Sequence, residues 1–337
     1  MQRKRFYGFD YLRALFSLLV VGWHTNVIDS LESIHIARVV DYNFELLSVP
    51  GFITISLFLF YQAADKNTNY FLSKRFPKLL TLYIFWTSLW VAFLVLSGRG
   101  YWLFENFFSL KKAFVFILSS GESVYYYLFT LILLTATSHL NLMMIHLIPD
   151  RTKMFSQLSL LFCSCLLVLL CSILPTLSDG FGALVKVWNP INFLPCVFVS
   201  FLIYQESEKE VKITNGKTQV KLLTLLTIFV LASTLEWIFL GDLEIWKPNA
   251  LPEYARISLV FGSWLLVYLS ILVKSNVPKP VRFLSDLSLG IYCLHYFFVK
   301  IFSCMFSSNI IVFTFSLIFS VSLTYILRKI EPLKSII

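Results

Sequence analysis

The chain has 337 residues, of which 58% are hydrophobic and only 14% are Asp, Glu, Lys or Arg. Soluble domains usually carry about 25% charged residues, so this composition excludes a soluble enzyme. The formal net charge of +9 does not indicate nucleic acid as a partner, because the basic residues stand in short clusters between apolar runs, where they orient membrane helices.

The apolar runs predict about ten transmembrane helices. Each run is close to the roughly 20 residues that an α-helix needs to cross a bilayer. Strands of an outer-membrane barrel would alternate in segments of about ten residues, so the continuous runs exclude that class. The predicted spans are 12–28, 46–64, 79–97, 123–141, 155–174, 188–204, 221–240, 254–273, 284–303 and 308–327.

The first span contains two ionisable residues. Arg13 and His24 interrupt its apolar run and no small-x-small cleavage site follows, so we expect a retained helix rather than a signal peptide. The two residues are 11 positions apart, which in an α-helix is about 20° in azimuth and roughly 16 Å in depth. They therefore share one face at two depths. Asp10 lies three residues before Arg13, within reach to offset its charge.

Residues 101–120 form a further aromatic segment between the third and fourth spans. Lys111 and Lys112 lie in its middle. Such a charged pair is typical of a segment at the membrane interface, so we predict an interfacial or re-entrant segment rather than an eleventh span.

Two later spans also contain ionisable residues. Tyr292 and His295 are three residues apart in the ninth span and therefore share a helix face near mid-membrane. They could orient a substrate, or they could simply satisfy each other's hydrogen-bonding groups. Glu236, near the outer end of the seventh span, could line an entrance or extend its carboxylate to the interface.

Lys and Arg are distributed unevenly between alternate loops. The set of loops that includes both termini holds 19 of them and the other set holds 8, with Arg13 counted in neither. The positive-inside rule therefore predicts that both termini lie in the cytoplasm.

Nothing in the sequence indicates a second domain or a metal site. No loop exceeds about 25 residues, so we expect residues 1–337 to form a single transmembrane domain without a separate soluble domain. The six cysteines all fall in apolar runs without metal-ligand spacing, which favours small buried hydrophobic residues.

The first and ninth spans carry motifs that resemble those of the membrane acyltransferase-3 family. In that family an Asp-x-Leu-Arg segment leads through an apolar run to His, and here residues 10–13 read Asp-Tyr-Leu-Arg and precede His24. Residues 288–295 read Ser-Leu-Gly-Ile-Tyr-Cys-Leu-His, similar to the family's late-helix signature Ser-x-x-Ile-Tyr-x-x-His.

Three segments between them are similar to the family in a looser way. Residues 51–59 resemble its Phe-Phe-x-x-Ser-Gly-Phe motif, with Ser56 in place and the following Gly replaced by Leu. The next cytoplasmic loop resembles its Arg-x-x-Arg motif, with Arg75 in place and Lys78 as the second cation. Tyr126 begins a Tyr-Tyr-Leu sequence where many members have Trp-Phe-Leu. The resemblance extends from residue 5 to about residue 300.

The resemblance implies a multi-pass O-acyltransferase of the cell inner membrane, most simply an O-acetyltransferase. The implied donor substrate is acetyl-CoA or another acyl-CoA, with no bound cofactor. The implied acceptor is a lipid-linked or surface glycan, such as O-antigen, lipopolysaccharide or another polysaccharide. By position, His24 is the catalytic base and the donor is bound by Arg13, Arg75 and Lys78. The supporting residues are Asp10, Ser56, Tyr126, Tyr292 and His295.

These residue types suit acyl transfer. A sugar hydroxyl is a poor nucleophile at neutral pH, and a neutral imidazole such as His24 can take its proton. Arg75 and Lys78 offer cations to the phosphates of a cytoplasmic acyl-CoA, although positive-inside topology alone could explain them. The alternative hypothesis is a carrier or flippase for a glycan or acyl group, which would also use intramembrane Arg and His. A structural membrane subunit would not need the Arg13 and His24 pair.

Overall fold

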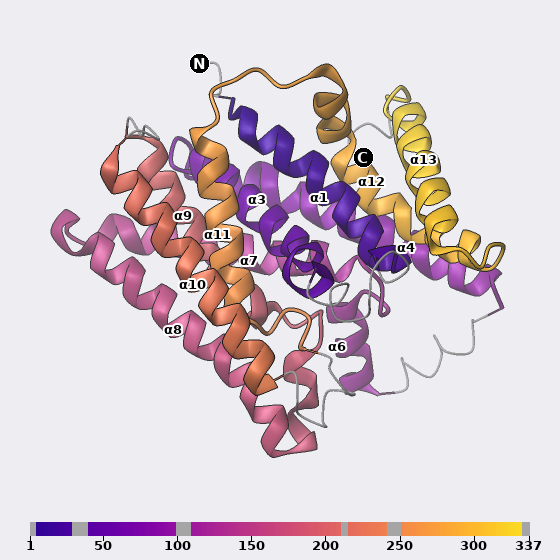
Figure 1. Ribbon diagram of the computed structural model, residues 1–337, viewed down its shortest axis with the longest axis horizontal. Coiled ribbons are helices and arrows are strands. Elements are labelled where there is room, and N and C mark those ends of the chain that lie inside the picture. Colours follow the sequence, from indigo (N-terminus) through magenta and orange to yellow (C-terminus); the bar gives the residue numbers. More distant parts are fainter. Residues whose placement is uncertain (1–4, 29–39, 99–108, 210–214, 241–250, 332–337) are drawn as a thin grey trace.

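The protein is an all-α membrane protein. The computed structural model describes residues 5–28, 40–98, 109–209, 215–240 and 251–331, and this part of the chain contains no β-strand. Several helices are long and apolar enough to cross a bilayer (Figure 1). The predicted fold class is thus confirmed at this level.

Each predicted span overlaps with one helix. The largest difference is at α9, which begins seven residues late because Pro190 starts a separate 3-10 turn and Pro195 then takes the first position of the helix. The ten helices are α1 (Tyr7–Thr25), α3 (Ser48–Ala64), α4 (Phe76–Leu96), α7 (Tyr126–Leu147), α8 (Asp150–Leu177), α9 (Pro195–Ser207), α10 (Gly216–Leu240), α11 (Ile257–Leu272), α12 (Lys279–Ser303) and α13 (Asn309–Leu327).

Length and composition mark six of the described segments as able to span a membrane. The count of ten crossings and the cytoplasmic position of the termini therefore stay predictions. Among the remaining helices, α9 and α11 have 13 and 16 residues, and α1 carries Asp10 and Arg13. The six segments are Val40–Ala64, Phe71–Leu96, Tyr126–Leu147, Asp150–Leu177, Gly216–Leu240 and Asn309–Leu327.

Helix α1 lies among its neighbours rather than at the edge of the bundle. It packs against α3, α11, α12 and α13, and Figure 1 shows it running between α11 and α12. The approach to α11 is close, because a Cβ atom added at Gly8 would lie 2.0 Å from the backbone oxygen of Ser270. A Cβ atom added at Gly51 of α3 would likewise lie 2.3 Å from the ring of Phe16. Only glycine fits at these two crossings.

Polar side chains face inward and many large apolar side chains face outward. On α8, for example, Phe162 and Leu166 are exposed, whereas Gln157 is fully buried. Many buried hydroxyls are satisfied within their own helices; Thr54 and Ser138, for example, donate to carbonyl oxygens four residues earlier, both at 2.8 Å. This arrangement fits a bundle whose outer surface contacts lipid.

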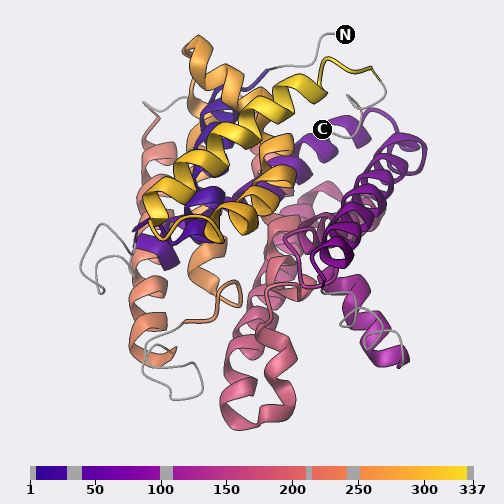
Figure 2. The ribbon, with the colours of Figure 1, turned by 90° about the vertical axis from the view of Figure 1, so that its right-hand side faces the viewer.

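The segment 101–120 contains a short helix, α6 (Leu110–Ser119). Ser109 caps it by accepting a hydrogen bond from the backbone of Lys112. Figure 2 shows α6 projecting from the bundle, where it contacts α7. Ten residues span only about 15 Å in a helix, which is too short for a crossing. Residues 101–108 of the predicted interfacial segment lie outside the described residues.

We expect Gly8→Val to destabilise the protein, because the added atoms would separate α1 from the backbone of α11. Overpacking of this kind typically lowers the free energy of unfolding by about 1 to 3 kcal/mol. Thermal unfolding in detergent measures the effect. Gly182→Ala is the control, because a Cβ atom there meets nothing within 4 Å. Equal stability of the two variants would contradict the close crossing of α1 and α11.

Candidate active site

Arg13 lines a cavity of about 340 Å³ between α1, α3, α4, α7 and α12. We call it the Arg13 cavity. Four other residues singled out in the sequence also line it, although they come from three separate segments: Ser56, Arg75, Lys78 and Tyr292. Tyr127 and Asp286, which the sequence did not single out, line it as well.

The side chain of Arg75 is held by Ser56, the residue that matches the family motif in the second span. Its Nη2 atom donates a hydrogen bond to the hydroxyl of Ser56 at 2.5 Å, and its Nε atom is buried without a partner. A π-helical turn, Phe71–Arg75, leads directly into α4 at this point. Such turns recur at functional sites. The two family-like motifs thus meet through one side-chain contact.

A second basic cavity adjoins the first. It measures about 550 Å³, and Arg75 and Lys78 line both cavities, while Lys66 and Lys74 line only the second. We call it the Lys74 cavity. Four cations around one opening would bind a polyanion such as a phosphate chain.

Asp10 does not form the ion pair expected with Arg13. Its carboxylate instead pairs with Arg5 at 2.7 Å and accepts a hydrogen bond from Ser285 of α12 at 3.1 Å. No described residue forms a hydrogen bond or ion pair with the Arg13 guanidinium. Its charge therefore remains available to a ligand in the Arg13 cavity.

His24 lines a separate cavity of about 740 Å³ at the other end of α1. We call it the His24 cavity. Its walls are rich in aromatic side chains, namely Trp23, Tyr42, Tyr126, Trp188 and Tyr296, and they include three charged residues, Glu122, Lys186 and Glu253. Aromatic faces beside a few polar groups are typical of a site for an amphipathic ligand.

A third, small cavity lies between these two. It has a volume of about 60 Å³, room for only a few water molecules. His24, Tyr126 and Glu253 line both this junction cavity and the His24 cavity, whereas Tyr292 lines both the junction cavity and the Arg13 cavity. Tyr292 therefore lies between the Arg13 cavity and the junction cavity, and the junction cavity in turn adjoins the His24 cavity.

The predicted two-depth arrangement of α1 is visible in these cavities. Arg13 and His24 share a helix face, and each lines one of the two large cavities. Tyr126 and Tyr127 are divided in the same way, since neighbouring helical residues point about 100° apart. Tyr126 lines the His24 cavity and Tyr127 the Arg13 cavity.

His295 is fully buried directly behind His24. The two ring centroids are 5.2 Å apart. The Nδ1 atom of His295 lies 2.6 Å from the carbonyl oxygen of Tyr292, and a carbonyl can only accept, so Nδ1 carries the proton. Its Nε2 atom is buried without a partner. His295 thus keeps a free lone pair in the protein interior beside His24.

Tyr292 and His295 do not satisfy each other through their side chains. The hydroxyl of Tyr292 donates to the carbonyl oxygen of Val124, and its ring packs on Tyr127 with centroids 4.8 Å apart. The rings of Tyr292 and His295 pack with centroids 5.8 Å apart, and the hydrogen bond between the two residues is to the backbone carbonyl of Tyr292. The hypothesis of a self-contained Tyr–His pair is therefore wrong.

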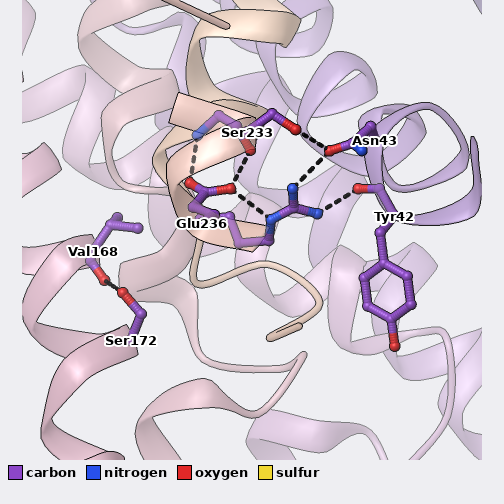
Figure 3. Close-up of polar contacts among 8 residues, drawn as sticks. Tyr42, Asn43, Val168, Ser172, Ser233 and Glu236 are labelled. Carbon is purple, nitrogen blue, oxygen red and sulfur yellow. Dashed lines mark hydrogen bonds and ion pairs between the residues drawn. The ribbon is translucent and has the colours of Figure 1, made fainter. Parts of the chain in front are cut away.

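Glu236 lines none of the four cavities described above and instead pairs with Arg256. Arg256 has no exposed side-chain surface and donates to Glu236 at 2.7 Å, to the Asn43 side chain at 2.8 Å and to the carbonyl oxygen of Tyr42 at 2.5 Å (Figure 3). Glu236 also accepts two hydrogen bonds from Ser258. These contacts explain why a carboxylate stands at position 236, so neither of its two predicted roles, lining an entrance or extending to the membrane interface, is needed.

The sequence did not identify Tyr127, Glu253, Asp286 or Arg256 as site or site-supporting residues. Glu253 and Arg256 lie at or before the predicted start of a span, where a charge is expected for topology alone. Tyr127 stood beside Tyr126 in the Tyr-Tyr-Leu sequence, and helical geometry would have placed it on another face. Among the described residues, no group of three or more His, Cys, Asp or Glu is arranged to hold a metal ion.

A comparison with protein families gives one match. Residues 6–329 match the family model described as an acyltransferase domain. The matched range includes every residue that lines the three cavities around Arg13 and His24. No curated protein and no solved structure matches the chain.

We expect Arg256→Leu to lower the free energy of unfolding by about 3 to 5 kcal/mol, because it leaves the Glu236 carboxylate buried without a cation. The double variant with Glu236→Leu should recover part of the loss, since no buried charge remains. Thermal unfolding in detergent provides the measurement, and Lys153→Leu, at a surface pair with Asp150, serves as a control without measurable change. An equal loss in the single and double variants would contradict charge pairing.

Proposed function

The chain belongs to the acyltransferase family whose domain it matches over residues 6–329, and from this premise we propose that it is an O-acyltransferase. The proposed reaction moves an acyl group, most simply acetyl, from acyl-CoA to a hydroxyl of a lipid-linked or cell-surface glycan. One observation carries the proposal. A cationic cavity and an aromatic cavity with a histidine lie on either side of a small junction cavity, which shares Tyr292 with the first and His24 with the second.

The proposed topology assigns each cavity to one side of the cell inner membrane. With ten crossings and both termini in the cytoplasm, the loop with Lys74 and Arg75 faces the cytoplasm. Acyl-CoA is made there, so the Arg13 and Lys74 cavities receive the donor. The His24 cavity then opens to the outer side, where it receives the glycan.

In the donor site, Arg13, Arg75 and Lys78 bind the phosphates of acyl-CoA. The absence of a protein partner for Arg13 among the described residues supports this role, since an unpaired guanidinium in a cavity favours an anion. Ser56 holds Arg75 in place. Lys66 and Lys74 extend the positive charge into the Lys74 cavity, which gives room for the remaining phosphates.

In the transfer step, His24 takes the proton of the acceptor hydroxyl as its oxygen attacks the thioester carbonyl carbon. The new C–O bond forms, the C–S bond breaks, and the proton on His24 passes to the departing thiolate of coenzyme A. The step is balanced without any other reactant. In this scheme the thioester reaches the junction cavity from the Arg13 cavity beside Tyr292, which lines both.

His295 acts as a positioning residue in this scheme. It lines none of the three cavities around Arg13 and His24 and has no exposed surface, so it does not reach a substrate. Its free Nε2 lone pair is suited to accept a hydrogen bond from the N–H group of His24. That contact would direct the other nitrogen of His24, as a lone pair, toward the acceptor hydroxyl.

A carrier or flippase would also use an intramembrane Arg and His, but it would leave the thioester intact. Membership of an acyltransferase family favours the enzyme. Purified protein in proteoliposomes, supplied with acetyl-CoA and glycolipid extracted from membranes that lack this protein, separates the two hypotheses. The enzyme releases free coenzyme A and forms an alkali-labile ester on the glycolipid.

We expect the double variant Arg75→Ala, Lys78→Ala to bind acetyl-CoA more weakly than the native protein. Each charge-assisted contact contributes about 1.5 to 3 kcal/mol, so the dissociation constant should rise by at least about tenfold. Calorimetry on the purified protein measures it. Arg151→Ala, at the start of α8 and on the same predicted side, controls for overall charge. Unchanged affinity would mean that the cluster only sets topology.

For His24→Ala we expect the rate of acyl transfer to fall by about 10² to 10⁴-fold, while acetyl-CoA binding changes little. His24→Gln should do no better, because an amide cannot accept the proton at neutral pH. Release of coenzyme A measures the rate. Near-normal turnover of a well-folded His24→Gln protein would exclude proton abstraction by this residue.

A further inference from the structure

Glu253 is the carboxylate nearest to the proposed chemistry. It lies in the short segment 251–256 that precedes α11. It lines the junction cavity and the His24 cavity, and His24 lines the same two. Glu122 lines the His24 cavity but not the junction cavity. In a space of about 60 Å³, one or two water molecules, or one hydroxyl group, can contact both Glu253 and His24.

The segment that carries Glu253 is held firmly. Arg256, three residues later, is locked by its contacts with Glu236, Asn43 and the carbonyl of Tyr42 (Figure 3). The neighbouring Tyr254 is buried and packs on Phe193 with ring centroids 5.0 Å apart. A carboxylate on so constrained a segment keeps its place beside His24, as preorganised catalysis requires.

The chemistry of acyl transfer gives this carboxylate two uses. When His24 takes the acceptor proton it becomes a cation, and a nearby anion stabilises that cation in the transition state. A carboxylate also accepts hydrogen bonds from sugar hydroxyls, which orients them. Both uses require a position that touches the acceptor and neighbours His24, and among the described carboxylates only Glu253 lines both cavities with His24.

We propose that Glu253 is a second catalytic residue of this site, whose carboxylate binds the acceptor sugar and stabilises the imidazolium that forms on His24. The inference rests on the proposed function. Glu253 exchanges no proton in the step: the hydroxyl proton moves to His24 and then to the thiolate of coenzyme A, while the acyl group moves from sulfur to oxygen.

The surroundings of Glu253 make its charge sensitive to pH. Burial raises its pKa to about 7, and the cation Lys186 opposes that shift. The carboxylate is thus largely ionised only above about pH 7, so a rate that depends on it rises as the pH increases through 7. The titratable groups that share its cavities come from several elements: His24, Tyr42, Glu122, Tyr126, Lys186, Tyr254, Tyr292 and Tyr296.

The test measures acyl transfer from radiolabelled acetyl-CoA to extracted glycolipid in proteoliposomes, between about pH 6 and pH 8.5. Glu253→Gln should reduce kcat/KM for the acceptor by about 10²-fold and abolish the rise through pH 7, with acetyl-CoA binding unchanged. Glu122→Gln, the matched change in the same cavity, should retain the rise.

A second variant tests the inference without altering Glu253. Lys186→Gln removes the cation that favours the ionised carboxylate, so the rise in rate should move to higher pH. A Glu253→Gln protein that keeps the native rate and pH profile would overturn the inference, and so would an unmoved profile in Lys186→Gln. Failure of the native protein to transfer any acetyl group would instead reject the proposed function.

Discussion

The structure depends on how one helix accommodates a cation inside an apolar bundle. An Arg near the centre of a membrane helix is unfavourable by about 2.5 to 3.5 kcal/mol unless water or an anion solvates it. Arg13 has no ion pair with any described residue, because the carboxylate of Asp10 pairs with Arg5 and accepts a hydrogen bond from Ser285. In this bundle Arg13 lines a cavity. The other walls of the cavity come from α3, α4, α7 and α12, which pack around the face of α1 that carries Arg13. The Arg13 cavity therefore provides both space for a ligand and room for the solvation of Arg13.

The same face of α1 connects two chemical environments. One large cavity is cationic and the other is aromatic, and only the small junction cavity and the ring of Tyr292 lie between them. This division suits a reaction whose two substrates approach from opposite sides of a membrane. In the proposed reaction, a polyanionic donor and a sugar need different walls, and an open channel between them would admit water, which would compete with the sugar hydroxyl for the thioester.

The buried cation Arg256 is stabilised in a different way, by partners within the protein rather than by a cavity. Arg256 is fully buried, but Glu236, Asn43 and a backbone carbonyl satisfy it. Because its side chain is fully buried and paired within the protein, it is not exposed to a ligand, and it instead fixes the segment that carries Glu253. The free guanidinium of Arg13 lines a cavity, whereas the guanidinium of Arg256, just before α11, is paired with Glu236 of α10 and with Tyr42 and Asn43, which precede α3. In the proposed function the first is a binding residue and the second a supporting one.

The sequence by itself determined the helices and the shared face of Arg13 and His24, because hydropathy and the 100° rotation per residue are local properties. It also indicated the motifs that supply Ser56, Arg75, Tyr292 and His295. Only the tertiary structure decided which of these residues meet. Ser56 holds Arg75, His295 lies behind His24, Asp10 pairs with Arg5, and Glu253 joins the cavity of His24. Most of these contacts join residues far apart along the chain, and their partners are fixed by helix packing, to which no local pattern in the sequence is sensitive.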